Sequence, residues 1–327
     1  MDELLRVRGL KTYYYSAKHV VPAVDGVSFS LRKGEVLGLV GESGSGKSTV
    51  ARSVTRIFNK AYTRIEGGEI LFHGRDLLKV PDRKMSDIRG RHIAMVFQNP
   101  QTSLNPVFSI GNQLAEALLL HQKMPRTLAR EKAVELLRQV NIPSPELRMG
   151  DFPHQLSGGM QQRVMIAIAL ACRPEIIIAD EPTTALDVTI QAQILDLFTR
   201  LRGEAGMSML LITHNMGVVA EVCDRMMVMY GGVVMEEGRC AEIFDKPLHE
   251  YTKGLLACIP DLDEDKDTLY SIPGQAPRLE APVTACRFSG RCGKAFGKCR
   301  GQEPPLFALG GGRAVRCWLY GGEEAAG

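Results

Sequence analysis

Residues 41–49, with the sequence GESGSGKST, carry the residue types and the spacing that a phosphate-binding loop requires. Gly41, Gly46, Lys47 and Ser48 fit the pattern G-x-x-x-x-G-K-[ST], in which the lysine reaches the β- and γ-phosphates of a nucleotide and the serine hydroxyl binds Mg²⁺. The glycines allow the backbone to turn tightly, so that successive N–H groups point toward one anion. We therefore expect nucleotide contacts from Gly41, Ser43, Gly44, Ser45, Gly46, Lys47, Ser48 and Thr49.

The segments on both sides of this loop favour phosphate binding over a chance Gly/Ser linker. The apolar run GEVLGLV at 34–40 is typical of a buried strand, and the residues after Gly46 have a helical pattern. A helix that begins at Lys47 adds its partial positive charge to the loop. This strand–loop–helix order is the context that phosphate binding needs.

A nucleotide site of this kind also needs an acid that holds the metal ion, and IIIADEP at 176–182 supplies one. Asp180 ends an apolar strand and is suited to hold Mg²⁺ through water. Glu181 follows directly and is placed to polarise an attacking water. The alternative is a pair of ordinary acids at a strand end, which a phosphate loop in the same chain disfavours.

The segment LSGGMQQRV at 156–164 predicts a second helix start that can receive an anion. Ser157 can cap the helix, and Gly158 and Gly159 expose further N–H groups at its beginning. The chain has one phosphate loop but two such helix ends, about 110 residues apart. The simplest explanation is that the second end serves a nucleotide held by another subunit.

The elements that must position these residues alternate along the chain. Short apolar segments at 4–10 and 27–31 fit an initial antiparallel sheet, 67–77 reads as a strand and turn, and 92–98 as a buried strand. Further strands are expected at 175–180, 208–214 and 225–232, separated by helices. This alternation predicts an α/β fold with a mainly parallel sheet.

A helical insertion interrupts this alternation. Apolar residues recur at helical spacing between about 110 and 140, and the insertion is expected to end near Phe152. The residues that make this pattern are Leu114, Ala117, Leu118, Leu128, Ala133, Leu136, Leu137 and Val140. A further helix is expected at 159–172, stopped by Arg173 and Pro174.

Composition narrows the class of protein. The 327 residues carry 24% charged residues that nearly cancel to +3, which does not suggest a nucleic-acid binder. No uninterrupted apolar stretch approaches the roughly 18 residues of a transmembrane helix, and the first residues lack the apolar core of a signal peptide. We therefore expect the chain to remain in the cytosol without crossing a bilayer itself.

Four of the eight cysteines, Cys286, Cys292, Cys299 and Cys317, gather near the end of the chain. In a reducing compartment such a cluster suggests a metal more than disulfides. Five, six and seventeen residues separate them, which fits neither usual zinc knuckles nor ferredoxin loops. The same region, 284–320, has seven Lys or Arg and one Glu. These basic residues could meet lipid headgroups, a partner subunit or only solvent.

At this point the sequence resembles the ATP-binding cassette (ABC) ATPases, whose signature is LSGGQ, with Met160 here in place of the glutamine. The resemblance covers residues 4–250 and identifies further motifs in the family order. Tyr14 matches the aromatic residue that stacks on adenine, with Tyr13 and Tyr15 as alternatives. Gln98 matches the Q-loop glutamine, TTALD at 183–187 matches the D-loop, and His214 matches the switch histidine.

The resemblance implies an ATPase with a P-loop NTPase (RecA-like) core, an antiparallel β subdomain, a helical ABC-specific subdomain and a small irregular C-terminal extension. Two subunits pair head to tail, and closing the pair completes each site. The implied catalytic residues are Lys47, Gln98, Glu181 and His214, and the implied Mg²⁺ contacts are Ser48, Gln98 and Asp180. The implied contacts to the partner subunit's ATP are Ser157, Gly158, Gly159, Met160, Gln161 and Asp187.

Several longer segments resemble the dipeptide/oligopeptide and nickel permease branch, among them MVFQNPQTSLNP at 95–106 and HEYTKGLL at 249–256. This implies an importer with a second, different ATPase subunit, two integral-membrane permease subunits and an extracytoplasmic solute-binding protein, attached to the cytoplasmic face of the cell membrane. The implied domains are 1–98 with 156–250 for the core, 99–155 for a permease-contacting helical subdomain, and 251–327 for the extension.

In relatives with these four cysteines the extension carries a [4Fe–4S] cluster, so the resemblance implies one here, with zinc or free thiols as alternatives. Peptides are the expected solute, and nickel or another small solute of the same branch stays open. A soluble ABC ATPase acting in DNA repair or on ribosomes is the alternative from another class. Such proteins usually have long coiled-coil insertions or two cassettes in one chain, neither of which is present. An exporter usually fuses the cassette to membrane helices, which this sequence lacks.

Overall fold

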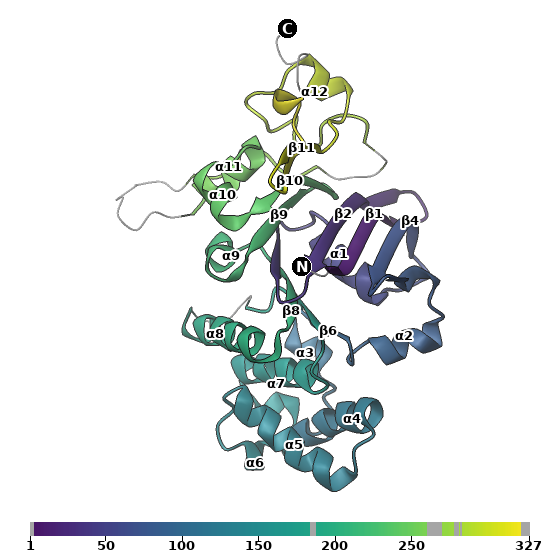
Figure 1. Ribbon diagram of the computed structural model, residues 1–327, viewed down its shortest axis with the longest axis vertical. Coiled ribbons are helices and arrows are strands. Elements are labelled where there is room, and N and C mark those ends of the chain that lie inside the picture. The colour runs from purple at the N-terminus through teal and green to yellow at the C-terminus, as the bar shows by residue number, and fades with distance from the viewer. Residues whose placement is uncertain (1–2, 184–187, 260–269, 278–280, 282, 322–327) are drawn as a thin grey trace. The chain divides into compact units, whose positions relative to one another are not determined.

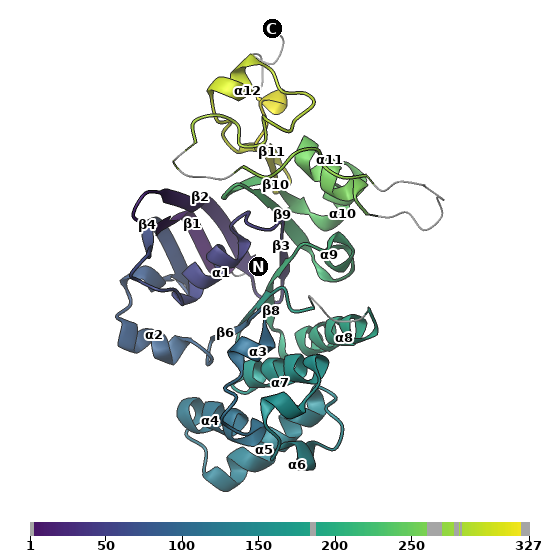
Figure 2. The same ribbon diagram turned by 180° about the vertical axis from the view of Figure 1, so that it is seen from behind.

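The computed structural model describes residues 3–183, 188–259, 270–277, 281 and 283–321 (Figures 1 and 2). The chain divides into two compact units. The helical unit consists of Met1–Asp2, Arg32–Glu35 and Lys79–Leu211, and the phosphate-loop unit of Glu3–Leu31, Val36–Leu78 and Ile212–Gly327. Each unit is therefore assembled from segments that are distant in the sequence.

The phosphate-loop unit contains a four-stranded sheet in the order β2-β1-β4-β5. Its strands are β1 (Glu3–Tyr15), β2 (Val20–Arg32), β4 (Thr63–Phe72) and β5 (Arg75–Asp76). Strand β1 pairs antiparallel with β4 from Leu5↔Phe72 to Tyr14↔Thr63. The antiparallel sheet is as predicted, but β1 and β2 have 13 residues each and extend beyond the expected 4–10 and 27–31. The sequence pattern marked only the part of each strand that is most apolar.

The strands of the second sheet that belong to the same unit have the order β11-β12-β10-β9-β3. Strand β3 (Val36–Val40) is buried along its whole length and pairs in parallel with β9 (Arg225–Tyr230), while β10 (Val233–Arg239) pairs antiparallel with β9. The C-terminal extension adds β12 (Arg313–Val315) to β10, followed by β11 (Phe307–Gly310). The sequence analysis missed this hairpin, although three glycines at 310–312 between two short segments are a turn signal.

Five α-helices of the phosphate-loop unit lie within its described residues. They are α1 (Lys47–Thr55), α9 (Met216–Val222), α10 (Cys240–Asp245), α11 (Glu250–Ala257) and α12 (Gly297–Gly301). An apolar cluster of this unit includes the aromatic side chains of Tyr230, Tyr251 and Phe288, each at most 3% exposed. Because Phe288 belongs to the cysteine-rich extension, that extension shares a hydrophobic core with strands β9 and β10.

The helical unit has three neighbouring strands, β6 (Ile93–Val96), β7 (Ile176–Asp180) and β8 (Ser208–Thr213), of which β8 contributes its first four residues. Strands β6 and β7 are parallel, with Ile93 opposite Ile176 and Val96 opposite Ala179. All five residues of β7 are buried, as the apolar run IIIAD predicts. The parallel strands expected at 92–98 and 175–180 are thus present.

The helices of this unit include the insertion that the sequence predicts (Figure 1). They are α2 (Asp82–Ile88), α3 (Pro100–Ser103), α4 (Ile110–Gln122), α5 (Arg126–Gln139), α6 (Pro145–Arg148), α7 (Gly158–Leu170) and α8 (Val188–Ala205). Leu114, Leu118, Ala133 and Leu137 are fully buried, but Leu128, expected on the apolar face, is 48% exposed. Among the described residues no helix is both long enough and apolar enough to cross a bilayer. Short 3-10 turns occur at Leu77–Lys79, Pro153–Gln155 and Trp318–Tyr320.

Candidate functional site

The phosphate loop joins β3 to α1, as predicted, and only glycine fits at two of its positions. Gly41 has φ 149°, and a Cβ there would lie 2.1 Å from the carbonyl oxygen of Met229. Gly46, directly before α1, has φ 105°, and a Cβ there would lie 2.2 Å from the carbonyl oxygen of Ala23. The main chains of β2 and β9 therefore lie too close to the loop for a side chain at either position. No side chain caps the start of α1, as suits a helix start that receives an anion.

Lys47 is 4% exposed, and its ammonium group bonds to the loop itself. Nζ donates to the carbonyl oxygens of Gly41 at 2.7 Å and Glu42 at 2.9 Å, with Ser45 Oγ at 3.4 Å. Carbonyl groups of the loop thus hold the ammonium charge, and phosphate oxygens can replace them. This is the arrangement expected of a lysine that binds β- and γ-phosphates.

Tyr14 lies beside the helix that follows the phosphate loop. Its hydroxyl shares a hydrogen bond of 2.9 Å with Thr49 Oγ1 of α1. The hydroxyls of the two alternatives for the adenine-stacking residue bond to carboxylates instead. Tyr13 donates to Asp25 at 2.9 Å, and Tyr15 donates to Glu66 at 2.6 Å. Burial and the bond to Asp25 raise the pKa of Tyr13 to about 12. Tyr14 is therefore the tyrosine of the three that contacts α1.

Gln98 and Glu181 meet in the helical unit, beyond the carboxyl ends of β6 and β7. Gln98 Nε2 donates to Glu181 Oε2 at 2.8 Å. Asp180, the last residue of β7, is 2% exposed, whereas Glu181 is half-buried and has φ 49°. A left-handed conformation is costly for a residue other than glycine, and such positions often occur at functional sites. At this turn the carboxylate of Asp180 is buried in the interior, whereas that of Glu181 accepts a bond from the amide of Gln98.

The LSGG segment forms the predicted helix start. Ser157 is the N-cap of α7, and its hydroxyl accepts a bond from the N–H of Met160 at 3.4 Å. Ser157 and Gly158 are exposed, and nothing lies within 4 Å of where a Gly158 Cβ would be. Gly159 and Met160 are half-buried. The first turn of α7 therefore presents an open edge that another molecule can approach.

The two glutamines that follow hold neighbouring segments of the same unit. Gln161, expected at a partner's ATP, is 6% exposed, and its Nε2 donates to the carbonyls of Pro153 at 2.8 Å and Leu156 at 3.2 Å. Gln162 is 2% exposed and donates to the carbonyl of Pro182 at 2.7 Å. Gln162 thereby connects the start of α7 with the turn that carries Glu181, a role that the sequence analysis missed. Two glutamines directly before the apolar part of this helix are the signal that could have indicated it.

His214, the expected switch histidine, follows β8 and is exposed at the start of α9. The next residue, Asn215, is the N-cap of α9 and accepts bonds from the N–H groups of Gly217 and Val218. This cap defines the turn on which His214 is carried. Asp187 of the expected D-loop lies outside the described residues.

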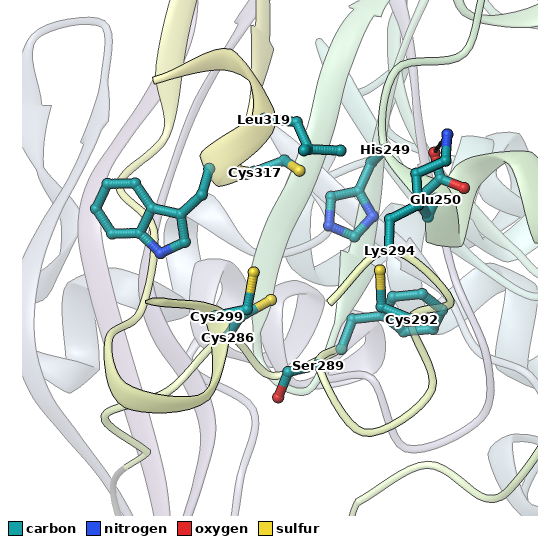
Figure 3. Close-up of a pocket in the computed structure, with 11 residues that line it drawn as sticks. His249, Glu250, Cys286, Ser289, Cys292, Lys294, Cys299, Cys317 and Leu319 are labelled. Carbon is teal, nitrogen blue, oxygen red and sulfur yellow. Dashed lines mark hydrogen bonds and ion pairs between the residues drawn. The ribbon is translucent and has the colours of Figure 1, made fainter. Parts of the chain in front are cut away.

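The four clustered cysteines line one pocket of the extension, together with His249 and Lys294 (Figure 3). The sulfur atoms of Cys286, Cys292, Cys299 and Cys317 surround a common space in this view. Burial raises the pKa of Cys286 to about 11 and also raises the pKa of Cys292 and Cys317. Backbone N–H groups of Phe288, Lys294 and Leu319 oppose this shift by donating to the three sulfurs.

The described residues include no group of three or more His, Cys, Asp or Glu arranged to hold a metal ion. The same residues contain eight free cysteines and no disulfide among them. The fold brings the four thiols to one pocket. Their arrangement is not that of a site for a single metal ion.

Arginines of the extension contact the core of the phosphate-loop unit. Arg287, whose side chain is fully buried, bonds to Asp25 at 2.6 Å and to Glu303 at 2.9 Å. Arg313 bonds to the fully buried Glu236 at 3.2 Å, and Arg316 donates to the carbonyl of Val234 at 2.9 Å. Lipid headgroups, a partner subunit and solvent were the expected surroundings of this basic region. For these three arginines the partners are instead groups of the chain itself.

Family comparisons match two parts of the chain. A model of the ABC transporter family matches residues 24–184, which include the phosphate loop and the LSGG segment. A model of the oligopeptide/dipeptide transporter C-terminal region matches residues 235–299, which include three of the four clustered cysteines.

Curated relatives match almost the whole chain. It is 48% identical to a probable peptide ABC transporter ATP-binding protein of Sinorhizobium fredii, over 97% of this chain and 95% of the relative. The oligopeptide transport ATP-binding protein AppD of Bacillus subtilis is 48% identical over 99% of both chains. The dipeptide transport ATP-binding protein DppD of the same organism is 46% identical over 98% of this chain and 95% of the relative.

Solved structures of ATP-binding cassettes share the fold. A post-hydrolysis dimer of the cassette MJ0796 bound to ADP and Pi has a TM-score of 0.66 and 28% identity, covering 72% of this chain and 98% of that one. The protein cbiO1 of Clostridium perfringens, described as part of the ABC transporter complex cbiONQ, has a TM-score of 0.63 and 27% identity, covering 75% of this chain and 92% of that one.

Proposed function

Because this chain belongs to the family of ABC transporter ATP-binding proteins, we propose that it is the ATP-hydrolysing subunit that powers uptake of dipeptides or oligopeptides through a membrane permease. The observation that carries this proposal is the match of nearly the full chain, including the C-terminal extension, to peptide-transport ATP-binding proteins at 46–48% identity. The phosphate loop, with its two obligatory glycines and buried Lys47, supports the ATPase chemistry.

The residues divide the reaction between them. The loop N–H groups, Lys47 and Thr49 bind the phosphates, Tyr14 stacks on the adenine, and Ser48, Gln98 and Asp180 hold Mg²⁺. Glu181 polarises the attacking water, oriented by its bond from Gln98. His214 contacts the γ-phosphate. Phosphoryl transfer needs mainly positioning and charge neutralisation, which these groups supply without a covalent intermediate.

A second ATPase subunit completes each site in this proposal. The start of α7, where Ser157 and Gly158 are exposed, offers N–H groups to the triphosphate held by the partner. Gly158, Gly159, Met160 and Gln161 follow in the first turn of the same helix. Asp187 is proposed as a further contact to the partner's ATP and lies outside the described residues. The side chain of Gln161 serves the helix start indirectly, by holding residues 153–156 in place. We propose a heterodimer with a homologous subunit, tested by trapping the pair with ATP and locating residues 157–159 beside the bound nucleotide.

We also propose that the chain has three functional parts: a core of residues 1–98 and 156–250, a helical subdomain of residues 99–155, and an extension of residues 251–327. The permease docks on the helical subdomain. Residues that line an open groove of this subdomain include Phe108, Leu119, Leu120, Arg126 and Arg130. Phe108 is 49% and Leu120 67% exposed, so the groove offers apolar surface for an inserted permease segment. In this proposal the chain works at the cytoplasmic face of the membrane, with two permease subunits and an extracytoplasmic binding protein.

We also propose that Cys286, Cys292, Cys299 and Cys317 hold a [4Fe–4S] cluster. The support for this proposal is that four cysteines, the number of ligands such a cluster takes, line one pocket and that three of their sulfurs accept backbone N–H bonds. When bound, the cluster would supply a cross-link between the segments of the extension that carry the four cysteines. Anaerobically purified protein should be brown, Cys292→Ser should lose that absorbance, and Cys258→Ser should keep it. Bound zinc, or colourless and metal-free protein, would overturn the cluster.

Reconstitution tests the transport function. The chain is combined with its partner ATPase, permease pair and binding protein in liposomes, and ATP hydrolysis is measured with the binding protein loaded with peptide or with nickel. Stimulation by peptide supports the proposal, and stimulation by nickel alone supports the other solute of the same branch. Hydrolysis that responds to neither, with no association with a membrane protein, would favour an ABC ATPase without a transport role.

A further inference from the structure

Glu42 of the phosphate loop is held at all three of its polar groups, although the phosphate-binding pattern places no requirement on its residue type. Its N–H donates to the hydroxyl of Tyr251 at 2.8 Å. Its carbonyl oxygen accepts the 2.9 Å bond from Lys47 Nζ. Its carboxylate accepts a bond from Arg291 at 2.8 Å. Two of the three partners come from the C-terminal part of the chain, 209 and 249 residues away.

Arg291 is itself fixed by the cysteine-rich extension. Its side chain is 8% exposed, and its other N–H groups donate to the carbonyls of Pro273 at 2.8 Å and Ile272 at 3.1 Å. The guanidinium lies 5.7 Å from the ring centre of Tyr230 and 5.9 Å from that of Phe288. Because the planar guanidinium of Arg291 is bonded on several sides, it has a fixed position and in turn fixes the carboxylate of Glu42.

The position of Glu42 matters for the lysine that binds phosphate. Lys47 bonds to the main chain of Glu42, and the loop must keep its N–H groups aimed at one anion. Fixing both the main chain and the carboxylate of Glu42 leaves the loop less freedom to lose on binding. Such preorganisation increases affinity by lowering the ordering cost of the complex.

We propose that Arg291 is a positioning residue for the phosphate loop, so that the docked C-terminal extension raises the affinity of the chain for ATP. The site that benefits is the chain's own ATP site, and Arg291 acts on it through Glu42 without touching the nucleotide. This inference goes beyond peptide import and does not depend on what the four cysteines bind.

The test measures the dissociation constant of Mg-ATP and the thermal unfolding midpoint of the full chain for Arg291→Ala, Arg291→Lys, Glu42→Gln and the double variant Glu42→Gln/Arg291→Ala. Removing a hydrogen bond between charged groups should weaken ATP binding about tenfold. Arg291→Lys should restore part of this loss. The double variant should bind ATP no more weakly than either single variant, because both remove the same contact.

Arg313→Ala is the matched control, since Arg313 also joins the extension to the core, through Glu236. It should leave the dissociation constant unchanged. Three results would overturn the proposal: Arg291→Ala binding ATP like the wild type, Arg313→Ala weakening binding equally, or additive losses in the double variant. If Arg291→Ala does not fold, Glu42→Gln and Arg291→Lys decide the question, and wild-type ATP affinity in both would overturn it.

Discussion

Gln98 and Glu181 are joined by a 2.8 Å hydrogen bond although 83 residues separate them in the sequence. They meet because β6 and β7 are adjacent parallel strands, and each residue follows the carboxyl end of its strand. Side chains at this edge of parallel strands commonly form the functional sites of α/β proteins. The bond orients the carboxylate that we propose as the base for hydrolysis.

Glu181→Gln should bind ATP but hydrolyse it at least about a hundredfold more slowly, because the amide cannot polarise water as a carboxylate does. The paired subunits should then remain closed around unhydrolysed ATP. Single-turnover hydrolysis and nucleotide binding measure the two effects separately. Glu175→Gln, at the other end of β7, is the control and should turn over normally. Wild-type turnover by Glu181→Gln would remove Glu181 from its role.

Lys47→Ala should weaken Mg-ATP binding about 10- to 100-fold, the value of one or two hydrogen bonds to a charged group. Lys47 is buried at the loop, and its replacement removes the charge that faces the phosphates. Equilibrium binding of a fluorescent ATP analogue measures the change. Lys18→Ala, at an exposed position, should not alter binding. Unchanged affinity in Lys47→Ala would contradict the phosphate loop.

Ser157 allows the helix cap and the partner contact to be tested separately. Asparagine and aspartate both cap helices well, so Ser157→Asn and Ser157→Asp should each preserve the stability of α7. Ser157→Ala should lower the free energy of unfolding by about 1 kcal/mol. Aspartate, however, brings a negative charge to the edge that we propose for the partner's triphosphate. ATP-dependent pairing, measured by size-exclusion chromatography, should be lost in Ser157→Asp and kept in Ser157→Asn; equal pairing in both would argue against the shared site.

The apolar groove can be tested with one charge. Leu120→Glu places a carboxylate in the groove and should abolish co-purification with the permease while ATP binding stays normal. Leu147→Glu is the control, because Leu147 is 73% exposed in the same helical subdomain but does not line the groove. Loss of the permease in both variants, or in neither, would show that the groove is not where the permease binds.

The ion pair between Arg287 and Asp25 predicts a dependence of stability on acid. Burial opposes the charge on Asp25, but bonds from Arg287 and Tyr13 outweigh burial and lower the pKa of its carboxyl group. A lowered pKa in the folded state stabilises the protein above the usual value near 4 and ceases to do so as pH falls through the folded value. The difference in unfolding free energy between wild type and Asp25→Asn, measured by denaturant titration, should be constant at pH 5–6 and narrow below about pH 4. A constant difference down to pH 3 would contradict this account.

The sequence alone was sufficient for the parts of the protein that depend on local spacing. The glycines and lysine of the phosphate loop, the cap at Ser157 and the buried strand before Asp180 are each encoded within about nine residues, and all are present as predicted. Their conformations are determined by backbone freedom, capping and burial, which neighbouring residues control.

Only the tertiary structure decided which distant residues meet. Nothing in the local pattern indicates that Arg291 bonds to Glu42, that Arg287 bonds to Asp25, or that residues 307–315 extend the core sheet. These contacts join segments up to 262 residues apart. A charged side chain that is buried on folding needs a partner of opposite charge. Which residue becomes that partner depends on how the whole unit packs, because packing determines which distant segments lie together.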